Sequence, residues 1–133
     1  MSTYQVLEDP DGMLEAELPL DRATHAGLMT AVLGWTDPVA LQPRDYEQIA
    51  LQLTAYARAV ASDLEGHVDR TPADDRRRAL AELVLGETAR RLPRPYGGTM
   101  GCAQSRARLL RALYERLDRF EEPGPARLEA SSP

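Results

Sequence analysis

The sequence predicts an all-α protein, folded as an antiparallel bundle of about four helices. Apolar residues recur every three or four positions in four separate segments, which is the spacing of the buried face of a helix. Residues that favour helix ends stand at the borders of these segments. The connections between the segments are short, and short connections favour antiparallel neighbours.

The composition is that of an ordinary globular protein with one domain. The chain has 133 residues, of which 43% are hydrophobic and 28% charged, and a net charge of −5. It contains neither a long apolar run nor the basic and apolar regions of a signal peptide, so we expect a cytoplasmic protein that does not enter a membrane. A single cysteine excludes an internal disulfide.

All sixteen basic side chains are arginine, and the sequence has no lysine or asparagine. Both missing residues have AT-rich codons, so a GC-rich genome of the actinobacterial type explains the bias. The number of arginines is therefore weak evidence for phosphate recognition, although arginine suits that task.

The expected organisation is an N-terminal arm over residues 1–19, a helical bundle over residues 20–121 and a disordered tail over residues 122–133. In the arm, alternating apolar residues flank the turn sequence Pro10-Asp11-Gly12, so it is either a short hairpin or an irregular segment. The tail is small, polar and rich in proline.

The first two helices are expected over residues 21–34 and from residue 43 to about residue 67. Asp21 is a good N-cap, and Gly34 ends the first helix. Pro43 suits the first turn of the second helix, which would be about 37 Å long at 1.5 Å per residue. The expected inner positions are Ala26, Leu28, Met29, Val32 and Leu33 in the first helix, and Tyr46, Ile49, Ala50, Leu53, Tyr56, Ala57, Val60, Ala61 and Leu64 in the second.

The third helix is expected to begin with Thr71 as its cap and Pro72 in its first position, and to stop before Pro93. The fourth is expected to begin near residues 99–101 and to end at Glu122-Pro123. The expected inner positions are Leu80, Leu83, Val84, Thr88 and Leu92 in the third helix, and Ala103, Ala107, Leu109, Leu110, Leu113, Tyr114, Leu117 and Phe120 in the fourth.

The connection between the third and fourth helices is the candidate ligand site. Glycines before a helix N-terminus can present backbone N–H groups to an anion, and nearby arginines can complete a phosphate or carboxylate pocket. The competing interpretation is a loop that only reverses the chain, with Thr99 capping the helix that follows, because neither a P-loop ending nor a dinucleotide fingerprint is present. The candidate residues are Arg91, Arg94, Tyr96, Gly97, Gly98, Thr99 and Cys102.

We assign no catalytic residues, no metal ligands and no cofactor from the sequence. Cys102 lies in a first helical turn, where a thiol pKa falls, but nothing places His25 or His67 beside it as a base. Asp63 and His67 stand four residues apart on one helix, and two ligands are too few for a closed metal site. The sequence leaves open whether the protein is an enzyme and favours a non-catalytic role.

Charge is divided unevenly along the chain. Residues 1–65 carry 11 acidic and 3 basic side chains, and residues 76–119 carry 11 arginines against 4 acids. The interpretation we favour is that the acidic half packs against the basic half within one bundle. A basic face that meets an acidic protein or a nucleic acid is the alternative, and no recognition-helix motif supports the nucleic acid.

The segments 86–92 (GETARRL) and 103–113 (AQSRARLLRAL), with Leu33-Gly34, resemble a family of small actinobacterial helical proteins of unknown function. Some members are labelled as natural-product biosynthesis proteins, so the resemblance implies a link to such a pathway. The loop Pro95-Tyr96-Gly97-Gly98 departs from the more proline- and glycine-rich version expected in that family.

Three functions remain open at this point. The first is an accessory protein that binds another protein or its own copy as a homodimer. The second is a protein or enzyme that binds a small anionic molecule in a biosynthetic pathway. The third is a regulator that binds nucleic acid through basic helices.

Overall fold

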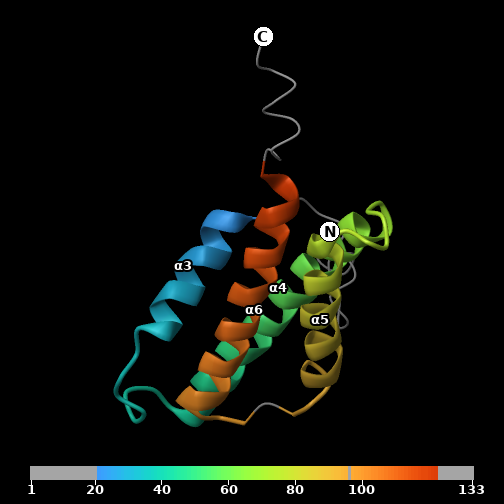
Figure 1. The fold of residues 1–133 in the computed structure, drawn as a ribbon. Coiled ribbons are helices and arrows are strands. Elements are labelled where there is room, and N and C mark those ends of the chain that lie inside the picture. Colours follow the sequence, from blue (N-terminus) through green and yellow to red (C-terminus); the bar gives the residue numbers. More distant parts are fainter. Residues whose placement is uncertain (1–20, 96, 123–133) are drawn as a thin grey trace, which may run out of the picture.

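The computed structural model describes residues 21–95 and 97–122, and these residues form four α-helices and no strand (Figure 1). The all-α prediction is therefore confirmed for the described part of the chain. None of these helices combines the length and the apolar character that crossing a bilayer requires. The predictions for residues 1–19 and for the tail beyond Glu122 lie outside the described residues. The helices are α3 (Arg22–Leu33), α4 (Pro43–Asp69), α5 (Arg76–Arg91) and α6 (Met100–Glu121).

Consecutive helices run antiparallel, and α4 and α6 form the central pair (Figure 1). These two helices make the most extensive contact in the described structure, and they run parallel to each other. Helix α3 packs on one side of α6, and α5 packs on the other. Because α3 and α4 make few contacts, α6 is the element that holds the described helices together.

The core lies along the seam between α4 and α6. Most of the residues predicted to face inward in these two helices are buried or half-buried, because apolar side chains at 3.6-residue spacing share one face. Val32 of α3 and Ala81 of α5 complete the core from the flanks. The fully buried apolar residues of the central pair include Leu53, Ala57, Val60 and Leu64 on α4 and Ala107, Leu110, Leu113 and Leu117 on α6.

Helix α3 is attached to α6 by polar contacts as well as by packing. His25 is buried and shares a hydrogen bond of 2.6 Å between its Nδ1 and the hydroxyl of Tyr114. Its ring stacks on Tyr56 of α4 with a centroid distance of 3.9 Å. Burial raises the pKa of Tyr114 to about 12, so this phenol stays protonated at neutral pH. At the other end of α3, Gln104 Nε2 donates to the carbonyl oxygens of Val32 and Trp35, at 3.1 and 3.0 Å.

The inner face of α3 therefore differs from the predicted one at one position. Ala26 is exposed, and the neighbouring His25 is buried instead. The spacing of His25, Met29 and Val32 is itself helical, so the histidine belongs to the apolar face because Tyr114 satisfies its ring nitrogen.

The predicted start of α5 is wrong by about four residues. Asp75 is the N-cap, and its carboxylate accepts a 2.8 Å hydrogen bond from the Arg77 backbone N–H. Thr71 acts on the preceding helix instead, because its hydroxyl donates to the carbonyl of His67 at 2.6 Å. Pro72 lies in the turn between the two helices, where its carbonyl accepts from the Asp75 N–H at 3.1 Å.

The predicted inner face of α5 is also partly wrong. Leu83 is 70% exposed and Leu80 is 36% exposed, whereas Ala81 and Thr88 are buried. Alanine allows the helix to approach the core closely, and the Thr88 hydroxyl donates to the carbonyl of Val84 at 2.8 Å. Helix α5 is therefore rotated relative to the prediction, so that Leu80 and Leu83 face solvent.

Two leucines of α4 provide a matched test of the core. Replacing the fully buried Leu53 by alanine should lower the free energy of unfolding by about 2–5 kcal/mol, because it leaves a cavity in the α4–α6 seam. The same change at Leu51, which is 45% exposed, should cost less than about 1 kcal/mol. Urea denaturation followed by circular dichroism measures both values. Equal losses for the two variants would contradict the described packing.

Candidate functional site

The candidate loop lies between the C-terminus of α5 and the N-terminus of α6. Helix α5 ends at Arg91, and α6 begins at Met100 with Thr99 as its N-cap, as predicted. The Thr99 hydroxyl accepts from the Cys102 backbone N–H at 3.1 Å. Tyr96, one of the predicted ligand residues, lies outside the described residues.

A buried arginine closes this loop. Arg106 of α6 is only 5% exposed, and its two terminal nitrogens donate to the carbonyl oxygens of Arg91 and Arg94 at 2.8 and 2.7 Å. The first carbonyl belongs to the last residue of α5, where backbone oxygens lack partners within the helix, and the second belongs to the loop that follows. Arg106 therefore caps α5 from a neighbouring helix.

Arg106 was absent from the predicted site, although the sequence carried a signal for it. It stands three residues after Ala103 and four before Leu110, and both of these are fully buried core residues. An arginine on the apolar face of a helix needs several fixed hydrogen-bond partners, and helix-terminal carbonyls supply them.

Packing against α4 explains one of the loop glycines. A Cβ on Gly98 would lie 2.6 Å from the carbonyl oxygen of Pro43 and 2.8 Å from its Cβ. Backbone atoms cannot yield to such a contact, so the first residue of α4 requires glycine here. Gly98 thus serves chain packing, which supports the interpretation of this segment as a connection that reverses the chain.

Three of the predicted residues do come together around a small pocket of about 130 Å³. Arg91, Arg94 and Cys102 line it. Ser105 also lines it, and Arg91 donates a hydrogen bond of 2.7 Å to the Ser105 hydroxyl. Gly97, Gly98 and Thr99 do not line this pocket. Ligand pockets for cofactors and drug-sized molecules measure about 300–1,000 Å³. This pocket is therefore smaller than such sites, and Arg106 and Pro95 complete its lining.

The environment of Cys102 favours its thiolate. Hydrogen bonding with Thr99 lowers the pKa of the Cys102 thiol most, followed by the Gly97 backbone N–H, which donates to Sγ at 3.4 Å. The positive charge of Arg106 acts in the same direction, whereas burial opposes it. The thiol is half-buried and free.

No histidine of the chain can act as a base for Cys102. His25 contacts Tyr114, which lies twelve residues along α6 and hence about 18 Å away at 1.5 Å per residue. His67 stacks on Phe120, which is about 27 Å along the same helix. Because these are the two histidines of the sequence, the geometry excludes a Cys-His pair.

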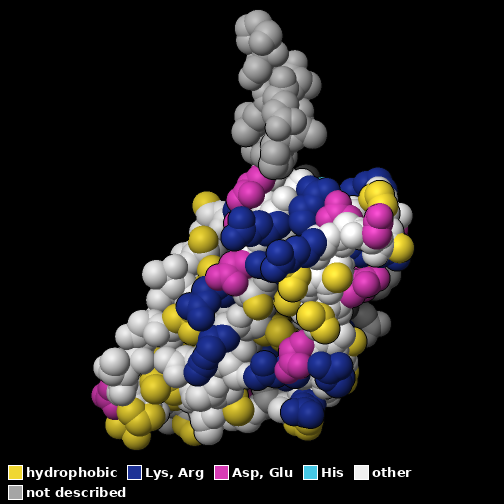
Figure 2. All heavy atoms as spheres, viewed as in Figure 1, with side chains coloured by type: hydrophobic (Ala, Val, Ile, Leu, Met, Phe, Trp, Pro, Cys, Tyr) yellow, Lys and Arg dark blue, Asp and Glu magenta, His cyan; other side chains and the backbone are white. Residues whose placement is uncertain are grey.

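A second surface, an apolar groove between α5 and α6, was not predicted as a site. It measures about 220 Å³, and Leu83, Val84, Leu109 and Ala112 form its floor and wall. Arg91, Arg108 and Glu87 complete its lining. Figure 2 shows arginine side chains spread over this face, with apolar side chains between them. We call this feature the α5–α6 groove.

Among the described residues, the ion pairs give no support to the favoured interpretation of the charge division, and five of the eleven acidic side chains of residues 1–65 lie outside these residues. The pairs that join the two halves of the described chain run in the opposite sense, because Arg22 of the acidic half binds Asp118 and Glu121 of the other half. The arginines of α5 pair locally, as in Arg78 with Glu82 and both Arg90 and Arg91 with Glu87. On the face of the described part that carries α5 and α6, arginine side chains lie at the surface (Figure 2).

Comparison of the chain with protein-family models, curated proteins and solved structures finds no match.

The arginine cap of α5 has a matched control two residues away. Replacing Arg106 by methionine should lower the free energy of unfolding by about 2–5 kcal/mol, because the two charged hydrogen bonds to the Arg91 and Arg94 carbonyls are lost. Replacing the exposed Arg108 by methionine should change it by less than about 0.5 kcal/mol. Urea denaturation compares the two. A neutral Arg106→Met variant would mean that the cap does not hold α5.

The pKa of Cys102 predicts how its reactivity depends on pH. Its alkylation rate should reach half of its plateau at a lower pH than that of the same chain unfolded in urea, because the contacts that lower the pKa of the thiol are then lost. Thr99→Val should move this midpoint upward, because the strongest stabilising contact is lost, whereas Thr99→Ser should retain it. Iodoacetamide kinetics across pH provide the measurement. Ser105→Ala, at a residue lining the same pocket, is the control; an unchanged midpoint in Thr99→Val would refute the assigned cause.

Proposed function

We propose that this chain is a non-catalytic helical accessory protein that acts by binding another protein through the α5–α6 groove. The observation that carries this proposal is Leu83, which is 70% exposed on a helix whose other side is packed in the core. Exposed leucines beside an apolar groove are typical of a surface that a partner covers. The accessory role in natural-product biosynthesis belongs to the same proposal and rests on the family resemblance.

The occupant of the groove is an amphipathic helix that carries acidic side chains beside its apolar stripe. A helix-in-groove contact needs an apolar floor, which Val84, Leu109 and Ala112 supply. The positive charge around the groove favours an acidic partner, because residues 76–119 carry seven more arginines than acids. Arg108 is exposed at the rim, where it can meet a carboxylate of the partner.

The prediction can be tested with a designed probe. A labelled helical peptide with leucines at every third or fourth position and glutamates beside them should bind in a fluorescence-anisotropy titration. Leu83→Asp should weaken binding at least about tenfold, which corresponds to roughly 1.4 kcal/mol. Leu51→Asp, on the exposed side of α4, is the matched control and should leave binding unchanged.

Three further results would contradict the proposal. The first is equal binding of a peptide whose glutamates are replaced by lysines. The second is concentration-dependent self-association in light scattering that Leu83→Asp abolishes, because the groove would then hold a second copy of the chain. The third is tighter binding of a DNA or RNA duplex at low salt, which Arg108→Glu weakens.

A further inference from the structure

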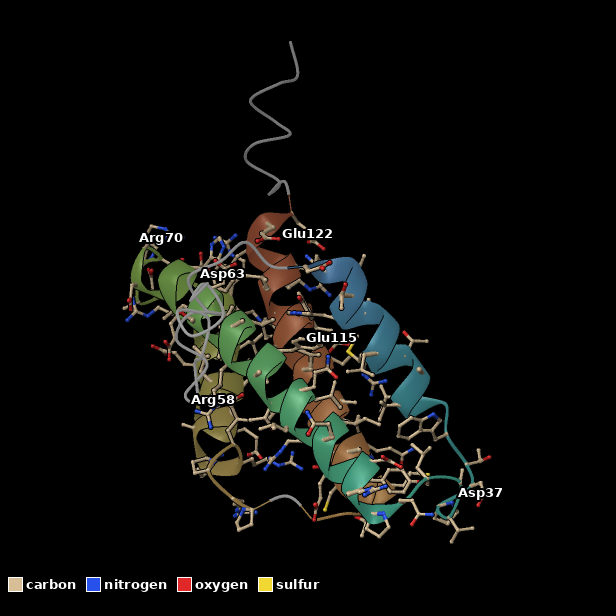
Figure 3. All side chains as sticks on the ribbon, turned by 180° about the vertical axis from the view of Figure 1, so that it is seen from behind. Asp37, Arg58, Asp63, Arg70, Glu115 and Glu122 are labelled. Atoms are coloured by element: carbon tan, nitrogen blue, oxygen red, sulfur yellow. The ribbon has the colours of Figure 1, made fainter. Side chains whose placement is uncertain are left out.

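Three side chains that bind metal ions in proteins lie together near the C-terminal ends of α4 and α6. Asp63 and His67 come from α4, and Glu121 is the last residue of α6. One ligand atom from each side chain lies within 4.8 Å of the other two. Figure 3 shows Asp63 at the same end of the molecule as Glu122, the residue that follows Glu121. The parallel arrangement of the central helices thus adds a third ligand to the pair visible in the sequence.

Neighbouring residues orient two of the three ligands. The His67 ring stacks on Phe120 at a centroid distance of 5.4 Å and an angle of 17°, and this places Nε2 3.7 Å from Glu121 Oε2. The other oxygen of Glu121, Oε1, lies 3.5 Å from Nη1 of Arg22. Arg22 therefore holds one carboxylate oxygen while the second faces the histidine, as the outer partners of metal ligands do. The four-residue spacing places Asp63 on the His67 face of α4.

The donor set selects the class of ion. One imidazole nitrogen with two carboxylate oxygens suits a divalent first-row transition metal, whereas magnesium and calcium prefer oxygen alone. Zinc ligands lie about 2.0–2.2 Å from the metal, so ligand atoms in a tetrahedral site are about 3.3–3.6 Å apart. The 3.7 Å distance between His67 Nε2 and Glu121 Oε2 is close to this value. Asp63 is exposed, so its side chain can rotate to close the remaining distance.

The backbone also favours a cation at this position. The C-terminal end of a helix carries a partial negative charge, and its effect is confined to the last turn. His67 lies in the last turn of α4, and Glu121 lies in that of α6. Because the two helices run parallel, both negative ends meet at the cluster (Figure 1).

We propose that Asp63, His67 and Glu121 bind one divalent transition-metal ion, for which zinc has the best-fitting chemistry. The ion links the last turns of α4 and α6. Three protein ligands leave the fourth position to water, so the site is open in the sense that catalytic zinc sites are. The proposal is independent of the α5–α6 groove.

Zinc titration of the purified full-length chain, after treatment with a chelator, tests the proposal. Isothermal titration calorimetry should show saturable binding of one zinc ion per chain. Replacing His67 by glutamine or Glu121 by glutamine should weaken binding at least tenfold. Glu122→Gln is the matched control, because it removes an adjacent exposed carboxylate that pairs with Arg119 instead. It should leave the affinity unchanged.

Two additional measurements distinguish zinc bound at this cluster from zinc bound at the thiol or at scattered surface carboxylates. Zinc should raise the melting temperature of the unmodified chain and should not raise that of His67→Gln, whose helicity by circular dichroism should be normal. Cys102→Ser should bind zinc as the unmodified chain does, because the thiol lies at the other end of α6. Loss of binding in Cys102→Ser, retention in His67→Gln or Glu121→Gln, or no saturable binding would overturn the proposal. The last result would leave the cluster as an ion network between two helices.

Discussion

The packing of α4 along α6 is the contact on which the other features of the molecule depend. The parallel direction of this pair brings both N-termini to one end and both C-termini to the other (Figure 1). At the first end, Gly98 packs on Pro43, and the loop pocket forms beside the start of α6. At the second end, His67 reaches Glu121. Both sites thus follow from one helix pairing.

Two polar side chains of α6 fasten the flanking helices to this pair. Gln104 holds carbonyls at the end of α3, and Arg106 holds carbonyls at the end of α5. Successive residues of a helix are rotated by about 100°, so side chains two positions apart, as these two are, point to nearly opposite sides of α6. This spacing matches the placement of α3 and α5 on the two sides of α6. Helix α5 is turned so that Leu83 is exposed and lines the α5–α6 groove.

Periodicity and capping residues were sufficient to predict the number of helices in the described part and most of their ends. The caps Asp21 and Thr99 accept hydrogen bonds where they were expected. The start of α5 was missed because Thr71 and Asp75 are both good caps. The choice between them depends on the bond from Thr71 to His67. The inner face of α5 was also missed, because a small residue, Ala81, packs where a leucine was expected.

The candidate site was harder to predict, because its residues meet through contacts between distant segments. A glycine that avoids Pro43 and a glycine that cradles phosphate look the same in sequence, so Gly98 was ambiguous. Glu121 belongs to a different helix from Asp63 and His67, and only the parallel pairing brings it to them. Arg106 is the exception, because its place on an apolar face already indicated a structural role.

Hydrogen exchange of the native protein tests most directly whether the α4–α6 pair carries the fold. Amides in the middle of α4 and α6 should exchange only through global unfolding, since these helices share the buried seam. Amides of α3 and α5 should exchange faster, through openings that leave the central pair folded. Protection of α3 or α5 equal to that of α4 and α6 would contradict the central role of this contact.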